Sequence, residues 1–490
     1  MDAEFGQSIA GIDGSAAKAC ELMLSESKGV PWRPSALDGE QDKSDSGRRT
    51  LIEQGFTFYR ELDLVEGCTN ARAGALDATA DFVALLKRLR IAAEAATQQL
   101  EPGHSIKVYV GTHDGQGHHR GHHRSFRIDR QLFDLIMGGK SPHQHLLRSF
   151  QAALTTILGQ GEILLDKKAP FVLSDRANIT VQRGIGPQTM ERRTQINSRD
   201  EALSGELSDV FARLHVIAFD ATICQMATFL SLGLMQLFLA QLTTGIYTKN
   251  LCLDDDYLAL HSWNSDPSLK RRNLLVDGQT RLTLPEYLLR HIESMHEFLD
   301  TDECAVLAPD AVMIIREATR VVDAAHRGDR DTLFGSLDWA TKLRLLEASG
   351  IEPGSLDAQA ASLLYGDLSD EGLFTAIDAA GGTRHLVSEE KIVRSLTNPP
   401  EETRAWCRTM LLHRFPDKIQ RMDWDFLDIT QGGSSIRVDL ADVARMNRAE
   451  TEHLFSEKDD QVLLQNLQRL GRQVVREARV KTGAFIGSAS

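Results

Sequence analysis

The sequence predicts an α+β fold, with a largely antiparallel sheet packed against helices and a smaller, mostly helical C-terminal part. Short segments rich in β-branched and aromatic residues occur over the first 220 residues. Longer stretches with apolar residues at three- and four-residue spacing lie between and after them. The two kinds of segment are mixed in order, without the regular alternation that predicts a parallel sheet.

Each predicted element follows from its local pattern. The predicted strands are residues 56–62, 105–111, 161–165, 178–182 and 213–219. The predicted helices are residues 74–99, 220–249, 284–299, 311–326 and 457–481, the last amphipathic and ending before Gly483. Residues 36–49 are polar and rich in turn formers, which predicts a mobile loop.

Composition excludes several classes of protein. The 490 residues carry 55 basic and 69 acidic side chains, a net charge of −14, so an extended basic face for nucleic acid or anionic lipid is not expected. The six cysteines form no CxxC pair, which argues against a zinc knuckle or a disulfide framework. The first residues lack the basic and apolar regions of an export signal. We therefore expect a cytoplasmic protein.

The uncharged run between Asp220 and Lys249 is long enough to cross a bilayer. It contains three glutamines, and no aromatic belt marks its ends. We expect a helix buried in a large core rather than a membrane span.

Motifs of common nucleotide-binding and hydrolase folds are absent: GxxxxGK[ST], GxGxxG, GxSxG and HExxH do not occur. Acidic residues remain on or beside the predicted strands. Asp2 and Glu4 alternate along one strand, and Glu61 and Glu66 flank the end of another. Such carboxylates would suit Mg²⁺ or Mn²⁺ with nucleotide phosphates. Solvated acids at strand ends are the alternative reading.

Residues 111–124 hold five histidines among glycines, directly after a predicted strand. A transition-metal site and a flexible, hydrated loop are equally compatible with this composition. His215 is flanked by apolar residues, which alone would predict a buried core histidine.

In chain order, these pieces resemble the family of Pup ligase and Pup deamidase/depupylase, which is related to glutamine synthetase. The matching segments are DAEFG (2–6), QGFTFYRELDLVEG (54–67), YVGTHDGQGHHRGHHRSF (109–126), INSRDE (196–201), LDWATKLRLLE (337–347), YGDLSDEGLF (365–374) and NPPEETRAWCRTMLLHRFP (398–416). The last three are most similar to the depupylase branch. Glu61 stands where the family has its catalytic Asp, and His123 and Arg124 replace a family Glu and Asn.

The resemblance implies a glutamine-synthetase-like fold, with a curved sheet that forms a cradle for ATP. It implies an ATP-binding catalytic domain over residues 1–330, a small C-terminal domain over 331–430 and an extension with an amphipathic helix over 431–490.

The resemblance also implies site residues. The implied ligands of Mg²⁺ or Mn²⁺ are Asp2, Glu4, Glu66 and His215, the implied catalytic group is Glu61, and the implied nucleotide-site residues are His122, Arg199, Arg404, Arg408 and Trp424. Guanidinium groups pair bidentately with phosphate. Trp424 would stack on adenine or pack in the core. Loss of a carboxylate at His123 should weaken Mg²⁺ binding or shift preference toward softer metals.

The function implied first is that of an ATP-dependent deamidase or depupylase, which cleaves the C-terminal glutamine amide or the isopeptide bond of a Pup-like modifier. A Pup-like protein ligase, which joins a modifier glutamate to a substrate lysine, is the second reading. A degenerate relative that binds nucleotide and acts on another substrate is the third. Expected partners are the modifier and modified proteins, with no nucleic acid and no membrane.

Overall fold

The structure is a computed structural model that describes most of the chain. The described residues are 1–27, 29–31, 48–114, 118–139, 141–165, 170–186, 192–198, 200–247 and 250–487, with the side chains of Asp2 and 481–487 left out. Residues 36–47 of the predicted loop, and Arg199, therefore lie outside the described residues.

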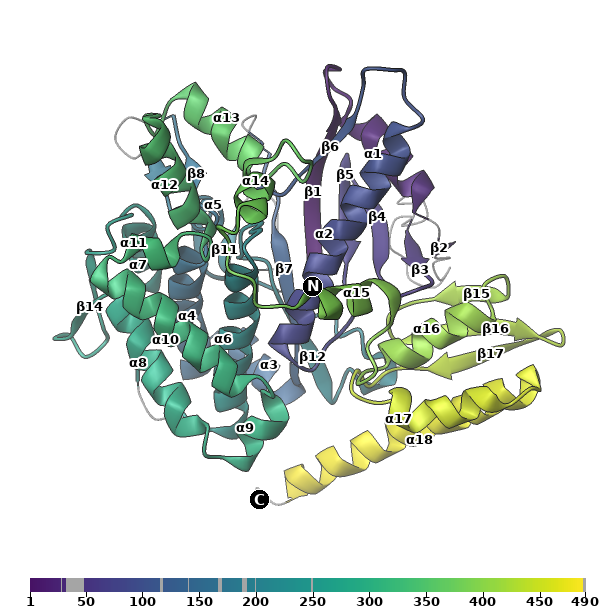
Figure 1. Ribbon diagram of the computed structural model, residues 1–490. Helices are drawn as coiled ribbons and strands as arrows, with labels where there is room; N and C mark the ends of the chain where they lie inside the picture. Colours follow the sequence, from purple (N-terminus) through teal and green to yellow (C-terminus); the bar gives the residue numbers. More distant parts are fainter. Residues whose placement is uncertain are drawn as a thin grey trace.

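Within this part of the chain, eight strands form one antiparallel sheet through the middle of the molecule (Figure 1). Seven lie in the order β12-β7-β1-β5-β4-β3-β2, and β6 pairs with the far end of β1. Their bounds are β1 Asp2–Ile9, β2 Gly29–Pro31, β3 Arg49–Leu51, β4 Thr57–Glu61, β5 Leu64–Cys68, β6 Ile106–Tyr109, β7 His122–Asp129 and β12 Phe211–Val216. The predicted α+β class with a largely antiparallel sheet is confirmed.

One face of the sheet packs against α1 (Ala16–Glu26) and α2 (Ala75–Thr97). Phe5 of β1 and Val65 of β5 are buried there with Phe82 of α2. Because side chains alternate along a strand, Glu4 must point to the other face. The core thus fixes which residues are left for a site.

A second group of helices builds the largest core, around α6 (Gln225–Thr244). This helix is long and apolar enough to cross a membrane, but 89% of its most apolar window is buried inside the protein. Its Gln241 donates to the backbone and hydroxyl oxygens of Ser294, both at 3.1 Å. The helix ends at Gly245, which takes a positive φ of 71°. The prediction of a buried core helix is confirmed, with shorter bounds than 220–249.

The other helices of this part surround α6 or connect the strands. They are α3 Arg130–Met137, α4 Pro142–Ile157, α5 Asp175–Asn178, α7 Asp256–Asn264, α8 Leu284–Phe298, α9 Asp302–Leu307, α10 Ala311–Arg327 and α11 Arg330–Leu333. The short strand pairs are β8 Glu162–Ile163 with β9 Phe171–Val172, β10 Gln182–Gly186 with β11 Thr194–Asn197, and β13 Arg272–Leu274 with β14 Arg281–Thr283. A short helical turn occupies Gly205–Leu207.

The C-terminal region is mostly helical, as predicted, but also contains a three-stranded sheet. Its elements are α12 Asp338–Ser349, α13 Leu356–Tyr365, α14 Leu373–Ala379, α15 Glu389–Thr397, α16 Ala405–Arg414, β15 Ile419–Met422, β16 Phe426–Gln431, β17 Ser434–Asp439, α17 Arg448–Thr451, a turn at Glu452–Ser456 and α18 Asp460–Gly487. Leu463 and Leu467 of α18 pack on this sheet. The domain boundaries at 330 and 430 stay predictions; Trp339 lies in the largest core, and β16 spans residue 430.

Two local predictions were wrong. Residues 178–182 are not a strand, because Ser174 caps α5 by accepting a hydrogen bond from the Ala177 N–H, and β10 begins only at Gln182. The amphipathic helix does not end before Gly483, since α18 continues to Gly487. A glycine within a helix costs only about 1 kcal/mol, which the preceding turns can offset.

Candidate functional site

Three carboxylates meet on the face of the sheet opposite α1 and α2. Glu4 of β1 lies directly across from Glu66 of β5, and Glu66 lies across from Tyr59 of β4. Glu61 follows Tyr59 by two residues and therefore shares its face. Strand alternation and register alone thus bring together residues that are up to 62 positions apart.

One oxygen from each of Glu4, Glu61 and Glu66 lies within 4.8 Å of the other two. Glu66 is buried, Glu4 is partly buried and Glu61 is exposed. Hard divalent cations prefer oxygen ligands, so this donor set fits Mg²⁺ or Mn²⁺. Asp2, the other acid predicted on β1, pairs through its backbone with Cys68 and His123.

Two histidines continue this face beyond Glu4. His123 of β7 has its Nε2 3.9 Å from a Glu4 oxygen, and its ring meets that of His215 on β12 at a centroid distance of 5.1 Å. The Nδ1 of His215 is 3.0 Å from the Ser125 hydroxyl. Burial, with smaller contributions from His215 and Arg176, holds the pKa of His123 well below its usual range. His123 is therefore neutral, the form in which imidazole binds metals.

Glu4 is held in place from a second direction. The backbone N–H of Gly121 donates to its Oε2 at 2.7 Å, and Nη2 of Arg176 lies 3.4 Å from the same oxygen. Burial raises the pKa of Glu4, and the neighbouring Glu61 raises it further, whereas Arg176 lowers it. Arg193 also interacts electrostatically with Glu4. Positive charge from Arg176 and Arg193 thus partly offsets the effect of burial on Glu4, which together with Glu61 and Glu66 is called the carboxylate cluster.

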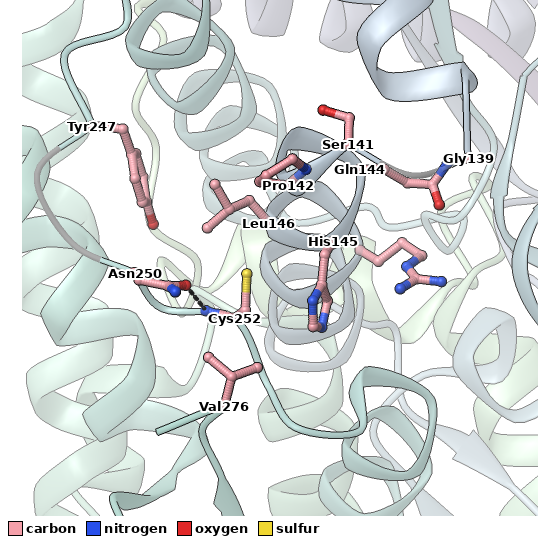
Figure 2. A pocket seen from close by; sticks show the side chains of 11 residues that line it. Gly139, Ser141, Pro142, Gln144, His145, Leu146, Tyr247, Asn250, Cys252 and Val276 are labelled. Atoms are coloured by element: carbon pink, nitrogen blue, oxygen red, sulfur yellow. Dashed lines mark hydrogen bonds between the residues drawn. The ribbon is translucent and has the colours of Figure 1, made fainter. Parts of the chain in front are cut away.

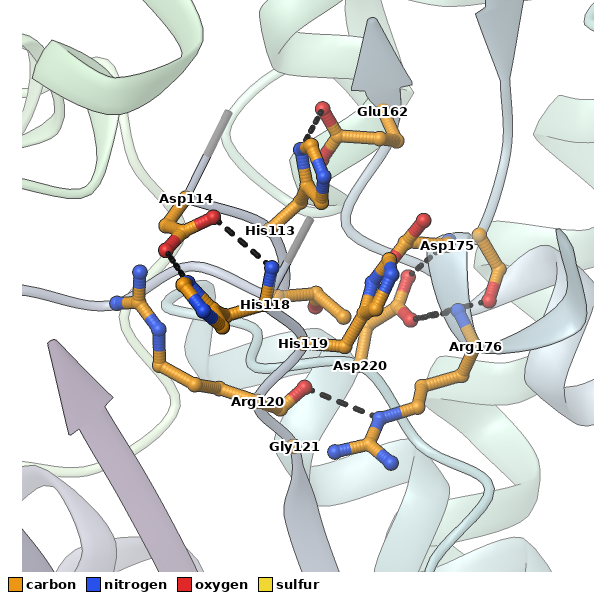
Figure 3. A network of polar contacts seen from close by, with 12 residues as sticks. His113, Asp114, His118, His119, Arg120, Gly121, Glu162, Asp175, Arg176 and Asp220 are labelled. Atoms are coloured by element: carbon orange, nitrogen blue, oxygen red, sulfur yellow. Dashed lines mark hydrogen bonds and ion pairs between the residues drawn. The ribbon is translucent and has the colours of Figure 1, made fainter. Parts of the chain in front are cut away.

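Asp220 anchors the short helix that carries Arg176 (Figure 3). Its carboxylate accepts hydrogen bonds from the backbone N–H groups of Gln160 (2.8 Å), Asp175 (3.2 Å) and Arg176 (2.8 Å), and from the Ser174 hydroxyl (3.1 Å). All of these groups are buried. Buried donors that lose their acceptor are costly, so this arrangement fixes the start of α5 firmly.

At the other side of the cluster, Arg408 and Trp424 lie together. The Arg408 guanidinium is 4.8 Å from the Trp424 ring centroid, and its Nη2 donates to the Thr50 hydroxyl of β3 at 3.2 Å. The Arg48 guanidinium lies 4.1 Å from the ring centroid of Tyr59, which is on the same strand as Glu61. Cationic and aromatic side chains thus contact strands β3 and β4 beside the carboxylates, although Arg408 itself is buried.

Two predicted site residues are not brought to the cluster. His122 is fully buried on the core face, with its ring 4.8 Å from that of Phe82. Arg404 is buried and donates to the backbone carbonyls of Leu203 (3.0 Å) and Leu440 (2.7 Å). Burial lowers the pKa of Arg404 to about 10. These contacts are structural and do not reach the carboxylates.

Sequence reasoning did not identify Gly121, Arg176 and Arg193 as site residues. They lie in irregular chain or in a four-residue helix, so no periodicity marks them. A glycine beside the histidines was the only available signal for Gly121. There a Cβ atom would be 2.2 Å from Nη2 of Arg176, so a larger residue would displace the guanidinium that contacts Glu4.

A separate cavity of about 630 Å³ opens near the start of α4 (Figure 2). Its lining includes Ser141, His145, Arg148, Tyr247, Asn250 and Cys252. No residue of the carboxylate cluster lines it. The volume is in the range of small-molecule pockets, but the carboxylate chemistry lies elsewhere.

Comparison with known proteins gives a consistent family. A family model described as Pup-ligase protein matches residues 21–428. A Pup deamidase/depupylase of Mycolicibacterium smegmatis is 30% identical over 372 residues, 73% of this chain and 71% of the relative. A Pup–protein ligase of Acidimicrobium ferrooxidans is 31% identical over 380 residues, 72% of this chain and 78% of the relative.

Solved structures share the fold. The crystal structure of the complex between the prokaryotic ubiquitin-like protein Pup and its ligase PafA aligns with a TM-score of 0.74 at 18% identity, covering 100% of this chain and 92% of that chain. The structure of the Pup ligase PafA in complex with ADP aligns with a TM-score of 0.69 at 19% identity, covering 92% and 98% of the two chains. The sheet, its covering helices and the family model lead to one assignment: the chain belongs to the Pup-ligase protein family.

Proposed function

We propose that this protein is an ATP-dependent enzyme that acts on the amide linkage of a Pup-like modifier. The observation that carries the proposal is the convergence of Glu4, Glu61 and Glu66 within 4.8 Å on the open face of the sheet. Relatives of both named activities, deamidase/depupylase and ligase, support the substrate class. The ADP complex of PafA supports the nucleotide.

The roles follow from position. Glu4 and Glu66 would hold the divalent cation, with His123 and His215 beside them on the same face. A bound cation would neutralise the oxygens of a nucleotide phosphate. Glu61 is the exposed member of the cluster, so it is the one able to take a proton from an attacking water or amine. Arg408 and Trp424 would contact the nucleotide, and Arg199 and Asp2 remain proposed participants by motif position.

Of the two reaction directions, we place hydrolysis first. Phosphoryl transfer to a modifier glutamate needs strong neutralisation of phosphate charge by metal ions. In this chain a neutral imidazole, His123, replaces the family carboxylate next to Glu4, which removes one hard ligand. Hydrolysis of an amide does not consume ATP, so the nucleotide would act as a bound cofactor. This reaction is therefore less affected by the loss of one hard metal ligand. Ligation is the second candidate, supported by the ligase relatives and by the PafA fold.

The reducing cytoplasm is the compartment we propose for this activity. All six cysteines are buried and free in the structure. Burial raises the pKa of Cys407 and Cys224 above the usual range, so these thiols are unreactive.

A direct assay separates the candidates. The full chain is incubated with ATP and either Mg²⁺ or Mn²⁺, in turn with a Pup–lysine conjugate, with Pup ending in glutamine, and with Pup ending in glutamate plus a lysine-bearing protein. Intact-mass spectrometry reports conjugate cleavage, deamidation or conjugation, and a coupled assay reports ADP.

Release of free Pup or deamidation without stoichiometric ADP supports hydrolysis. ADP formation that depends on both modifier and acceptor supports ligation. Glu61→Ala should abolish either reaction, whereas Asp63→Asn, an exposed acid of the same hairpin, should leave it intact. No conversion with any substrate or metal would overturn the proposed function.

A further inference from the structure

A histidine and a buried carboxylate form a close pair next to the carboxylate cluster. The Nδ1 of His119 is 2.6 Å from Oδ2 of Asp175 (Figure 3). The Asp175 side chain is only 2% exposed, whereas the His119 side chain is 25% exposed. A carboxylate acceptor at Nδ1 places the proton on that nitrogen and leaves Nε2 as the reactive atom.

The pair is held rigidly relative to Glu4. Asp175 and Arg176 are consecutive residues of α5, and one contacts His119 while the other contacts Glu4. Arg176 also donates through Nε to the backbone carbonyl of Arg120 at 3.0 Å. Asp220 fastens both residues through their backbone N–H groups. A single anchored helix start therefore sets the position of the imidazole and of the carboxylate together.

Chain connectivity limits how far His119 lies from the cluster. Gly121, whose N–H donates to Glu4, follows His119 by two residues, a span of at most about 7 Å between Cα atoms. Arg193 interacts electrostatically with Asp175 and with Glu4. His119 thus belongs to the same short segment as the residue that holds Glu4.

We propose that His119, oriented by Asp175, is the proton carrier for the lysine amine nitrogen of the substrate. This role rests on the proposed function but is independent of its direction. An isopeptide bond that breaks requires a proton on the departing nitrogen, and one that forms requires removal of a proton from the lysine ammonium. The same imidazole serves both directions.

The proton balance is closed in each case. In hydrolysis the oxygen of water bonds to the carbonyl carbon and its proton passes to Glu61. The C–N bond breaks with its electron pair on nitrogen, which takes the proton from Nε2 of a protonated His119. The products are a free carboxyl group and a lysine amine. In ligation the acyl donor is the γ-glutamyl phosphate formed from ATP, and Nε2 accepts the proton that the lysine ammonium loses. The amine nitrogen then bonds to the carbonyl carbon, the C–O bond to phosphate breaks with its electron pair on the departing phosphate, and the second nitrogen proton passes to Glu61.

The leaving group gives a test that a merely structural role would not pass. For hydrolysis, wild type and His119→Gln are compared on a Pup–lysine isopeptide and on a Pup γ-(4-nitrophenyl) ester, whose phenolate departs without protonation. For ligation, lysine is compared with hydroxylamine, which is already uncharged at neutral pH. His118→Gln is the matched control, because His118 pairs with Asp114 at the same 2.6 Å but is 77% exposed.

We expect His119→Gln to lower kcat/KM for the lysine substrates about 100-fold or more, with little change for the nitrophenyl ester or hydroxylamine. Asp175→Asn should show the same selectivity, since it loses the acceptor that fixes the imidazole. Equal losses on both substrates, or no loss on either, would overturn this role while leaving the proposed function standing. Absence of turnover by wild type on every substrate would instead overturn the proposed function, and this role with it.

Discussion

The carboxylate cluster and the polar scaffold beside it are built in different ways. Glu4, Glu61 and Glu66 lie on three paired strands, so backbone register alone determines that they meet. The scaffold, which comprises residues 118–121, 174–176 and Asp220, is irregular chain and the start of α5, held by side-chain hydrogen bonds. The comparison shows that the sheet positions the chemical groups, whereas long-range polar contacts set their charge environment.

The largest effect is expected from the cluster itself. Glu66→Gln removes one of three converging carboxylates and a full negative charge, while the strand register remains. Activity in the conjugate assay should fall at least about 100-fold, since cation position controls the reaction. Titration calorimetry with Mn²⁺ should show a matching loss of affinity. Retention of both activity and Mn²⁺ affinity would show that this group of acids is not the metal site.

The corresponding change in the scaffold is Asp220→Asn. In wild type the carboxylate accepts hydrogen bonds from buried N–H groups. The NH₂ group of asparagine cannot accept them, so buried donors lose their partner. We expect a loss of about 2–4 kcal/mol in the free energy of unfolding, measured with urea. Asp331→Asn is the control, because this side chain is 92% exposed, and it should leave the free energy of unfolding unchanged. An unfolding free energy for Asp220→Asn equal to that of wild type would mean that the scaffold is not fixed by this residue.

This difference also explains what the sequence could predict. Alternation along DAEFG and after FTFY marked acids that could share a face, because a strand has a period of two, but solvated acids fitted the same pattern. The family resemblance was needed to single out Glu4, Glu61 and Glu66. The same rule separates His122 from His123: motif position suggested the former, but a shift of one residue changes the face, and His123 is the one beside Glu4.

Arg176 could not be predicted in the same way. It lies 172 residues from Glu4 in a four-residue helix, and its contact depends on how distant segments pack. Neither periodicity nor composition encodes that contact. The structure places Arg404 away from the cluster for a related reason, since basic residues near a site also serve as buried donors to backbone carbonyls, and its nucleotide role stays a prediction.

A moderate effect is expected at His123, where the two regions meet. His123→Glu places a fourth carboxylate next to Glu4, and hard cations gain an oxygen ligand while softer ones lose an imidazole. Mg²⁺ or Mn²⁺ affinity should rise about tenfold, equivalent to about 1.4 kcal/mol, and Zn²⁺ affinity should fall. His118→Glu adds the same charge at an exposed site and should do neither. An unchanged order of metal preference would place His123 outside the coordination sphere.

The smallest effect is a change of stability with pH, caused by a buried carboxyl group beside the scaffold. Glu162, whose Oε1 is 3.9 Å from Nδ1 of His113, is buried, and burial raises its pKa to about 8 although Lys342 opposes the rise. Because this folded-state pKa is above the unfolded one, its contribution to stability is present at low pH and is lost as pH rises through 8.

Wild type should therefore lose about 1 kcal/mol of unfolding free energy between pH 7 and 8 relative to Glu162→Gln, whose amide cannot ionise. Urea unfolding at a series of pH values measures this difference. Glu201→Gln, a partly exposed acid paired with Arg213, is the control and should follow wild type. If the two Glu162 curves run parallel, the carboxyl is already ionised at pH 6, and the charge of Lys342 rather than burial governs its ionisation.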